Sequence, residues 1–363
     1  MLKSLAVLVF SVLLIMPISG VVSASNQYAV SPQSHSFFYA KKRAKTLSFA
    51  LVADAPYGDE NVPAFDRLIS DVNADRSVRF VMHGGDIKSG GTECTDERIR
   101  ARFDQYQRFK RPFIFTPGDN EWTDCHRVSN GQYDPLERLQ FVRDLFYPYP
   151  GYTTGGRPMR VLSQSRYTGF ESFVENTLFK RSGVVFSTIH VVGSNNNLSP
   201  WSGIDANDSF DNPRPDRFAE FTAREQASIA WLQQTFRAAR ANRSRGVFIL
   251  IHGNPQFAVN EAEQGRAGFN AFLDELFRLT EQFGKPVVLA HGDSHVFFVD
   301  KPKLVPFYAD GNALSADDPQ QFLPNLTRVQ TFGDTPQHWI KVTVDHSKKS
   351  IFVIEPQVVR GNL

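Results

Sequence analysis

The stretch that decides the fold is Val78-Arg79-Phe80-Val81-Met82-His83-Gly84-Gly85-Asp86. It begins with a mainly apolar run of strand length and continues into a histidine, two glycines and an aspartate. Glycine lets the backbone turn sharply and approach a ligand closely. The pattern therefore predicts a buried strand that delivers Asp86, with His83 beside it, to a site at its carboxyl end.

Four further apolar runs end in the same way. They are Leu47–Ala53 before Asp54, Pro112–Phe115 before Thr116-Pro117-Gly118-Asp119-Asn120-Glu121, Val247–Ile251 before His252, and Pro286–Ala290 before His291-Gly292-Asp293-Ser294-His295. Stretches with helical spacing separate these runs, which is typical of an α/β fold. Sites in such folds lie at the carboxyl ends of the strands, so the polar residues are predicted to converge. Each could be a turn former or helix cap by itself, but converging carboxylates repel one another and favour a shared metal site.

Other segments complete the outline of the fold. The clearest helices are predicted from about Arg217 to Arg240 and from Gly268 to Phe283, the second closed by Gly284 before Pro286. Later strand candidates, expected to complete a second sheet, are Val296–Val299, His338–Val344 and Ile351–Ile354. The segment 147–183 is rich in Tyr, Gly, Pro and Ser, and is either a cap over the site or a surface excursion.

The first residues of the chain predict export. Lys3 precedes an apolar run from Leu5 to Met16, and Val22-Ser23-Ala24 offers small residues for cleavage. The run is shorter than the roughly 20 apolar residues that span a bilayer, so a signal peptide over 1–24 is predicted, with a retained anchor as the alternative. A loose lead-in over 25–45 and a domain over 46–363 should follow. The mature protein is expected to be secreted or periplasmic, with no membrane span.

Charge and cysteine content narrow the function classes further. The net charge of +2, from 40 basic and 38 acidic residues, gives no indication of nucleic-acid binding. The two cysteines, Cys94 and Cys125, are predicted to form a disulfide, since an exported protein meets an oxidising compartment. The alternative, a pair of thiolate metal ligands, lacks a Cys-x-x-Cys spacing.

The ordered motifs resemble those of the calcineurin-like metallophosphoesterases. That family carries, in sequence, Asp-x-His, Gly-Asp, Gly-Asn-His-(Asp/Glu), a His after a strand, and Gly-His-x-His. The matching stations here are Asp54-Ala55-Pro56, Gly85-Asp86, Gly118-Asp119-Asn120-Glu121, His252 and Gly292-Asp293-Ser294-His295. The resemblance covers about 47–295 and implies a two-sheet sandwich with α/β/β/α layers. It also implies a hydrolase that cleaves a phosphate ester by attack of a hydroxide bridging two metal ions.

The resemblance also assigns ligands, with departures from the family pattern in three motifs. Pro56 stands where the first motif has a His ligand, and Asp293 stands where the fifth motif has its first His. In the third motif Asp119 stands in the Asn column and Asn120 in the His column. Carried over by column, one ion is held by Asp54, Asp86 and His295, and the other by Asp86, Asp119, His252 and Asp293. A shift of one residue would make Asn120 the ligand in place of Asp119. This oxygen-rich set favours Mn, Mg or Ca over Zn, with Fe also open.

The source of the proton for the leaving group differs from the family as well. The family takes it from the histidine whose column holds Asn120 here, and an amide can donate a hydrogen bond but no proton. Asn120 and His291 are therefore the candidate catalytic residues, with His83, His126 or solvent as other sources of the proton.

The remaining expectations concern the substrate. Asn195 and Asn196, in the loop Ser194-Asn195-Asn196-Asn197, either contact substrate oxygens or form a plain turn. The expected substrate is a small-molecule or lipid phosphate ester. The rival function is a non-catalytic secreted protein that binds metal or phosphate on the same scaffold.

Overall fold

Two β-sheets stacked face to face form the centre of a computed structural model, which describes residues 46–257, 265–304 and 321–363. The predicted signal peptide (1–24) and lead-in (25–45) lie outside the described residues. Among the residues that the structure does describe, no helix combines the length and apolar character needed to cross a membrane.

The first sheet has five strands in the order β14-β13-β1-β2-β3. Their bounds are β1 Thr46–Val52, β2 Val78–His83, β3 Phe113–Phe115, β13 Trp339–Asp345 and β14 Phe352–Gln357. Strands β1, β2 and β3 are parallel, whereas β13 pairs antiparallel with both β1 and β14. The expectation that these two late strands complete the second sheet is wrong. They extend the first, because β1 has a free edge on which β13 pairs, with Leu47 opposite Val344.

The second sheet has seven strands in the order β4-β5-β6-β7-β8-β12-β9. Their bounds are β4 Leu162–Ser163, β5 Thr177–Arg181, β6 Val184–Thr188, β7 Gly246–Leu250, β8 Val287–His291, β9 Phe298–Asp300 and β12 Leu326–Gln330. Strands β6, β7, β8 and β12 are parallel, so their carboxyl ends share one edge. A separate pair joins β10 (Lys303–Leu304) to β11 (Gln321–Phe322).

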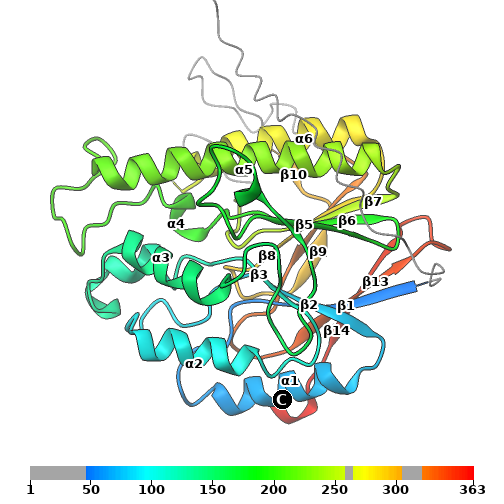
Figure 1. The fold of residues 1–363 in the computed structure, drawn as a ribbon, viewed down its shortest axis with the longest axis horizontal. Helices are drawn as coiled ribbons and strands as arrows, with labels where there is room; N and C mark the ends of the chain where they lie inside the picture. Colours follow the sequence, from blue (N-terminus) through cyan, green and yellow to red (C-terminus); the bar gives the residue numbers. More distant parts are fainter. Residues whose placement is uncertain (1–45, 258–264, 305–320) are drawn as a thin grey trace, which may run out of the picture. The chain divides into compact units, whose positions relative to one another are not determined.

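Helices cover the outer face of each sheet, which confirms the predicted α/β/β/α layers (Figure 1). The helices are α1 Val62–Ala74, α2 Asp96–Tyr106, α3 Pro135–Phe146, α5 Pro215–Ala241 and α6 Asn270–Phe283. Strand β1 shows why the layers form, since its residues alternate between two cores. Leu47, Phe49 and Leu51 pack between the sheets. Ala50 and Val52 pack against α1, α2 and α3, while α5 and α6 cover the second sheet.

Short helical turns connect these elements. They are η1 Thr123–His126, η2 Val128–Asn130, η3 Gln164–Arg166, α4 Gly193–Asn196, η4 Ala267–Phe269 and η5 Arg360–Asn362. The predicted stop of α6 is present, because Gly284 has a φ of +64° and its N–H donates to the carbonyl of Thr280. Glycine adopts this left-handed conformation without the steric cost of a Cβ atom.

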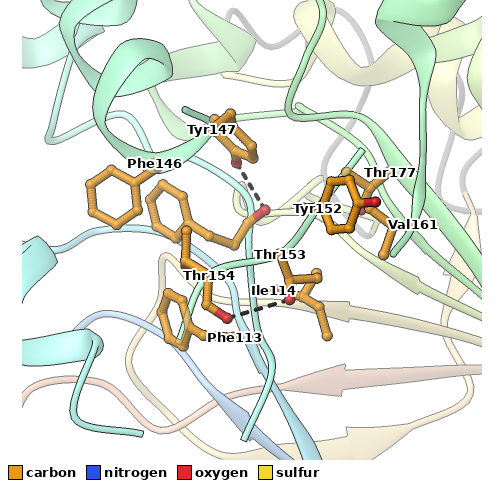
Figure 2. Close-up of a pocket in the computed structure, with 10 residues that line it drawn as sticks. Phe113, Ile114, Phe146, Tyr147, Tyr152, Thr153, Thr154, Val161 and Thr177 are labelled. Atoms are coloured by element: carbon orange, nitrogen blue, oxygen red, sulfur yellow. Dashed lines mark hydrogen bonds between the residues drawn. The ribbon is translucent and has the colours of Figure 1, made fainter. Parts of the chain in front are cut away.

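The segment 147–183 runs from the end of α3 to the outer strands of the second sheet and includes β4 and β5. Its first part returns to β3. The Tyr147 hydroxyl donates to the Phe115 carbonyl at 2.9 Å, and the backbone of Phe113 pairs with that of Thr154. Figure 2 shows the small hollow that these residues enclose with Tyr152 and Val161. In the described chain this stretch therefore connects the two sheets along their edges.

Candidate metal centre

The site lies where the carboxyl ends of the parallel strands of both sheets meet. Two groups of side chains there could each hold a metal ion, because the ligand atoms within a group lie within 4.8 Å of one another. One group is Asp54, Asp86 and His295, and the other is Asp86, Asp119 and His252. These residues follow β1, β2, β3, β7 and β8, as the sequence predicts. Asp86 belongs to both groups.

The backbone is held in an unusual conformation at three of these residues and at Asp293. The φ angles of Asp54, Asp86, Asp293 and His295 are +55°, +55°, +72° and +61°. Left-handed conformations are costly for residues with a Cβ atom and cluster at functional sites, where the surroundings enforce them. Gly85 shows how close the approach is, since a Cβ there would collide with the backbone of Gly118.

The carboxylate of Asp86 is at the centre of the site. Its Oδ1 accepts from the backbone N–H of Asn120 at 3.1 Å. Its Oδ2 accepts from the Tyr57 hydroxyl at 2.7 Å and from the Asn120 side-chain amide. Burial raises the pKa of Asp86 well above its usual value, and the charges of Asp119, Glu121 and Asp54 raise it further, against a lowering by His252. A carboxylate in this position is stabilised by a proton or a cation.

His252 presents one ring nitrogen to the site. Its Nδ1 lies 2.6 Å from the carbonyl of Gly84 and therefore carries the proton that is donated to that oxygen. This fixes the ring so that Nε2 lies 2.8 Å from Oδ1 of Asp119 and 3.2 Å from Oδ1 of Asp86. Metal-binding histidines are commonly oriented by such a bond from the other ring nitrogen. Burial lowers the pKa of His252, but Asp86, Asp119 and Asp54 outweigh it and raise the pKa well above 6.5.

Asp119 supplies the other carboxylate of the His252 group. Its Oδ2 accepts from the Ser194 hydroxyl at 3.1 Å. Burial raises its pKa, but the hydrogen bond and charge of His252 dominate and lower it below 3.8. The adjacent Asn120 directs its amide nitrogen to Asp86 and, at 3.2 Å, to the hydroxyl of Tyr57. Of the two alternatives left open by the sequence, this geometry favours Asp119 as the ligand.

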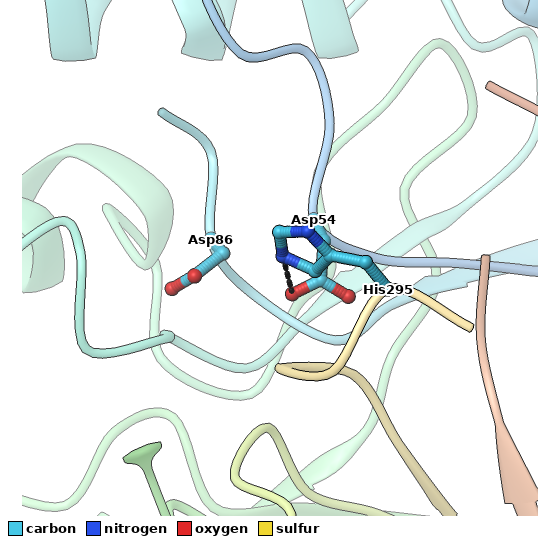
Figure 3. Close-up of side chains that lie close together, drawn as sticks. All are labelled: Asp54, Asp86 and His295. Carbon is cyan, nitrogen blue, oxygen red and sulfur yellow. Dashed lines mark ion pairs between the residues drawn. The ribbon is translucent and has the colours of Figure 1, made fainter. Parts of the chain in front are cut away.

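Asp54 and His295 complete the other group (Figure 3). Oδ1 of Asp54 lies 3.8 Å from Nε2 of His295 and accepts from the backbone N–H of Asp293 at 2.8 Å. Its Oδ2 accepts from the hydroxyl of Thr331 at 3.2 Å. Burial raises the pKa of Asp54 to about 7. His295 is half-buried, with 38% of its side chain exposed, so this group faces solvent more than the His252 group does.

Asp293 lies outside both groups, although the sequence assigns it to the second ion. Its Oδ2 accepts from the backbone N–H of Asn254 at 2.8 Å, so its carboxylate ties the loop after β7 to the loop after β8. Burial raises its pKa to about 6, and the charge of Asp119 adds to this. The structure therefore gives Asp293 a supporting position beside the ligand groups.

The chemistry of this donor set fits divalent cations. Carboxylates of Asp54, Asp86, Asp119 and Glu121 face one another in a buried region, which raises the pKa of three of them. The buried ammonium of Lys88 lies behind them and donates to the Asn130 side chain at 2.7 Å. Burial lowers the pKa of Lys88 to about 8. Oxygen donors with one or two imidazoles are the ligands that Mg, Mn and Fe take in proteins.

The histidines proposed as proton donors do not suit that role in this geometry. Burial lowers the pKa of His83 and of His291 to about 3, and that of the His126 side chain to about 4. The ring of His83 packs at a tilt against those of Tyr106 and Phe113, and Nδ1 of His291 lies 2.9 Å from the Gly292 carbonyl. A neutral imidazole has no acidic proton to give at pH 7. The prediction that His291, His83 or His126 supplies the proton is therefore not favoured. The sequence pattern places these histidines near the site but does not reveal that they are buried.

Asn195 and Asn196 are directed into the protein. Ser194, Asn195, Asn196 and Asn197 all have positive φ, so α4 is in fact a left-handed turn. The side chain of Asn195 accepts from the N–H of Gly268, and that of Asn196 donates to the Gly268 carbonyl, both at 2.8 Å. Asn196 also accepts from Arg224 and from the N–H of Val192. These amides therefore hold the turn in place. Ser194 is the residue of the turn whose side chain faces the carboxylates of Asp119 and Asp124.

Three residues near the ligands were not identified by the sequence pattern. Oγ of Ser194 lies 2.6 Å from Oδ1 of Asp124 and 3.1 Å from Oδ2 of Asp119, so its one proton is shared between the two carboxylates. Asp124 is buried, which raises its pKa to about 7. Tyr57 extends its hydroxyl between Asp86 and His295. Of these three, the sequence could have indicated only Tyr57. It is the first residue after Pro56 whose side chain has an atom able to bind a metal.

The cysteine pair lies beside the same loops. Cys94 and Cys125 form the predicted disulfide, with Cα atoms 5.8 Å apart. Both sulfur atoms lie 3.5 Å from the carbonyl oxygen of Asn120. The disulfide therefore joins the loop that follows Asp86 to the loop that follows Asp119. The carboxylates of these two residues both lie next to Nε2 of His252.

Comparison with known proteins gives structural neighbours alone. No family model and no curated protein matches this chain. One similar solved structure is described as GAP50, the anchor in the inner membrane complex of Plasmodium, with 10% identity and a TM-score of 0.49 over 88% of this chain and 86% of that one. Another is TT1561 of Thermus thermophilus, with 13% identity and a TM-score of 0.41 over 87% of this chain and 100% of that one.

Proposed function

We propose that this protein is a metal-dependent hydrolase of phosphate esters. The observation that carries the proposal is the position of Asp86, whose carboxylate belongs to two adjoining groups of ligand atoms. A shared carboxylate of this kind is what two neighbouring cations need. Divalent ions bound there would polarise a phosphoryl oxygen and make water a better nucleophile at neutral pH.

The residues of the chain have distinct tasks in this proposal. Asp54, Asp86 and His295 would hold the more exposed ion, and Asp86, Asp119 and His252 the more buried one. His252 is kept in the right orientation by Gly84, and Asp119 by Ser194. The amide of Asn120, which lies at the same edge, can donate hydrogen bonds but no proton, and its nitrogen is directed to Asp86 and Tyr57.

The expected substrate follows from the missing proton donor. The buried histidines are neutral at pH 7, and general-acid assistance is worth about 10²–10⁴-fold in rate. We therefore infer a small-molecule or lipid phosphate ester with a good leaving group. Export through the predicted signal peptide is part of the proposal, and the disulfide fits an oxidising compartment.

A second candidate is a non-catalytic protein that binds metal or phosphate at the same place. The specific observation in its favour is Asn120, which stands in the column of the catalytic histidine and bonds to Asp86 and Tyr57. Retained carboxylates support metal binding in either case. Turnover is what separates the two functions.

Elemental analysis of the purified protein is the first test, with Asp86→Asn beside it and Asp144→Asn as a control on the exposed face of α3. We expect up to two divalent ions in the native chain and in the control, and loss of both in Asp86→Asn. Aryl and alkyl phosphate mono- and diesters are then assayed with Mn and Mg. Hydrolysis of aryl esters that is lost in Asp86→Asn supports the enzyme, whereas bound metal without turnover on the whole panel supports the binding protein. A native chain that holds no metal after incubation with these ions contradicts the metal-dependent hydrolase and leaves the phosphate-binding protein as the function to test.

A further inference from the structure

The group formed by Asp54, Asp86 and His295 has three donors, and Pro56 stands where the resemblance places a fourth. Ions of this class usually take four to six ligands, with water completing the set. The next residue, Tyr57, turns its hydroxyl into the gap. We propose that the phenol oxygen of Tyr57 is a ligand of the ion held by Asp54, Asp86 and His295. This inference rests on the metal centre of the proposed function.

The distances suit a shared ion. The hydroxyl oxygen of Tyr57 lies 2.7 Å from Oδ2 of Asp86 and 3.2 Å from Nε2 of His295. Two donors bound to one ion at about 2.1 Å, at right angles, are about 3 Å apart. The phenol oxygen thus has the spacing of a co-ligand to two members of the group.

The position of Tyr57 is fixed from several sides. Its backbone N–H donates to Oδ1 of Asp334 at 2.8 Å, and its carbonyl accepts from the side chain of Asn61 at 2.9 Å. Its ring packs edge-on against the ring of His295, with centroids 5.1 Å apart. A donor atom held by the protein before an ion arrives costs less ordering free energy on binding than one on a free side chain.

The Tyr57 hydroxyl lies close to more polar groups than the one hydrogen-bond partner that a buried phenol needs. A phenol has one proton to donate, and here that proton is directed to Asp86. The amide of Asn120 lies 3.2 Å from the same oxygen, and His295 approaches from another side. Tyr147 differs in this respect, because its buried hydroxyl donates one hydrogen bond, to the Phe115 carbonyl. Coordination would release to solvent the proton that Tyr57 donates to Asp86, and it would use an oxygen that is already aimed at the group.

The oxygen type also makes a distinction among metals. Phenol oxygen is a hard, anionic donor when it binds a trivalent ion, so it adds to the preference of the carboxylates for Mn or Fe over Zn. Ferric iron bound to phenolate absorbs visible light by charge transfer from ligand to metal. That absorption reports the bond itself, whatever the activity of the protein.

The test compares the native chain, Tyr57→Phe and Tyr147→Phe after loading with ferric iron and removal of unbound metal. The last variant is the control, because it removes one hydroxyl from a buried tyrosine outside the site. Iron content and visible absorption are measured on each, and Mn²⁺ affinity is measured by titration calorimetry. We expect a charge-transfer band in the native chain and in Tyr147→Phe, no band in Tyr57→Phe, and a loss of affinity for one ion of about tenfold or more.

The outcomes separate this inference from the proposed function. An iron-loaded native chain without the band, or a Tyr57→Phe chain that keeps it, overturns the role of Tyr57 and leaves the metal centre standing. A native chain that binds neither iron nor manganese overturns the metal centre and this inference together. Circular dichroism of the metal-free variants checks that each has folded.

Discussion

Nε2 of His252 lies 2.8 Å from Oδ1 of Asp119, and both side chains are buried beside the shared carboxylate of Asp86. Because Nδ1 of His252 is already bonded to Gly84, the space between Nε2 and the two carboxylates is open to one of two occupants. A proton fills it in the metal-free protein, and a cation can replace that proton. Metal binding and protonation at this place are therefore in competition.

The first prediction concerns the stability of the metal-free protein. The folded state raises the pKa of Asp54 from 3.8 to about 7 and that of His252 well above 6.5. At a pH between the unfolded-state and folded-state pKa values of these groups, the folded protein binds more protons than the unfolded chain. These two groups therefore make stability fall as the pH rises through their folded-state pKa values. The buried histidines, whose pKa values are lowered to about 3 to 4, oppose this fall below about pH 6.5, where the unfolded chain protonates them. Thermal unfolding in EDTA is therefore expected to give a midpoint that decreases between about pH 7 and pH 9. Mn²⁺ should flatten this slope, and a midpoint that rises with pH in EDTA would contradict the proposal.

A second prediction separates the two ion positions. His295→Ala is expected to lose the more exposed ion and keep the other, because His295 contributes to the Asp54 group alone. His252→Ala should lose the more buried ion in the same way. Elemental analysis of each variant is the measurement, and His346→Ala, whose ring bonds to the Ser182 carbonyl, is the control. Loss of both ions from His295→Ala would show that the groups do not act separately.

The disulfide gives a third prediction. Cys94 and Cys125 are 31 residues apart, and closing a loop of this length stabilises a protein by roughly 3–4 kcal/mol on the chain-entropy estimate. The double change of both cysteines to serine should lower the free energy of unfolding in urea by about this amount. It should also weaken metal binding, since the bond joins the loops after Asp86 and Asp119. Unaltered metal affinity in the folded variant would limit the disulfide to a role in stability.

A fourth prediction distinguishes substrate contact from support at Asn196. Its side chain accepts from the buried guanidinium of Arg224 and donates to the Gly268 carbonyl. Asn196→Ala removes these two bonds and the one from the Val192 N–H, all in a buried region, which costs about 1–3 kcal/mol of stability. Urea unfolding measures this loss, and Asn207→Ala, an exposed residue, is the control. A raised KM with unchanged stability would instead support the substrate contact.

Parts of the fold were predictable because they depend on local pattern. Leu47–Ala53 and Val247–Ile251 alternate or continue in apolar character as buried strands do, and α6 ends at the glycine that its periodicity indicates. Sheet membership was not predictable for β13 and β14, since pairing depends on which edge remains free after β1, β2 and β3 have assembled.

The sequence by itself determined the kind of site: five strands each end in a carboxylate or imidazole, and parallel strands bring such ends to one edge. Only the tertiary structure decided which of these groups face one another. It turned His83 and His291 into the core, used Asp293 and Asn196 to fasten loops, and placed Tyr57 between Asp86 and His295. The physical reason is that a side chain's direction and burial depend on backbone angles and on neighbours distant in the chain, neither of which residue order encodes locally.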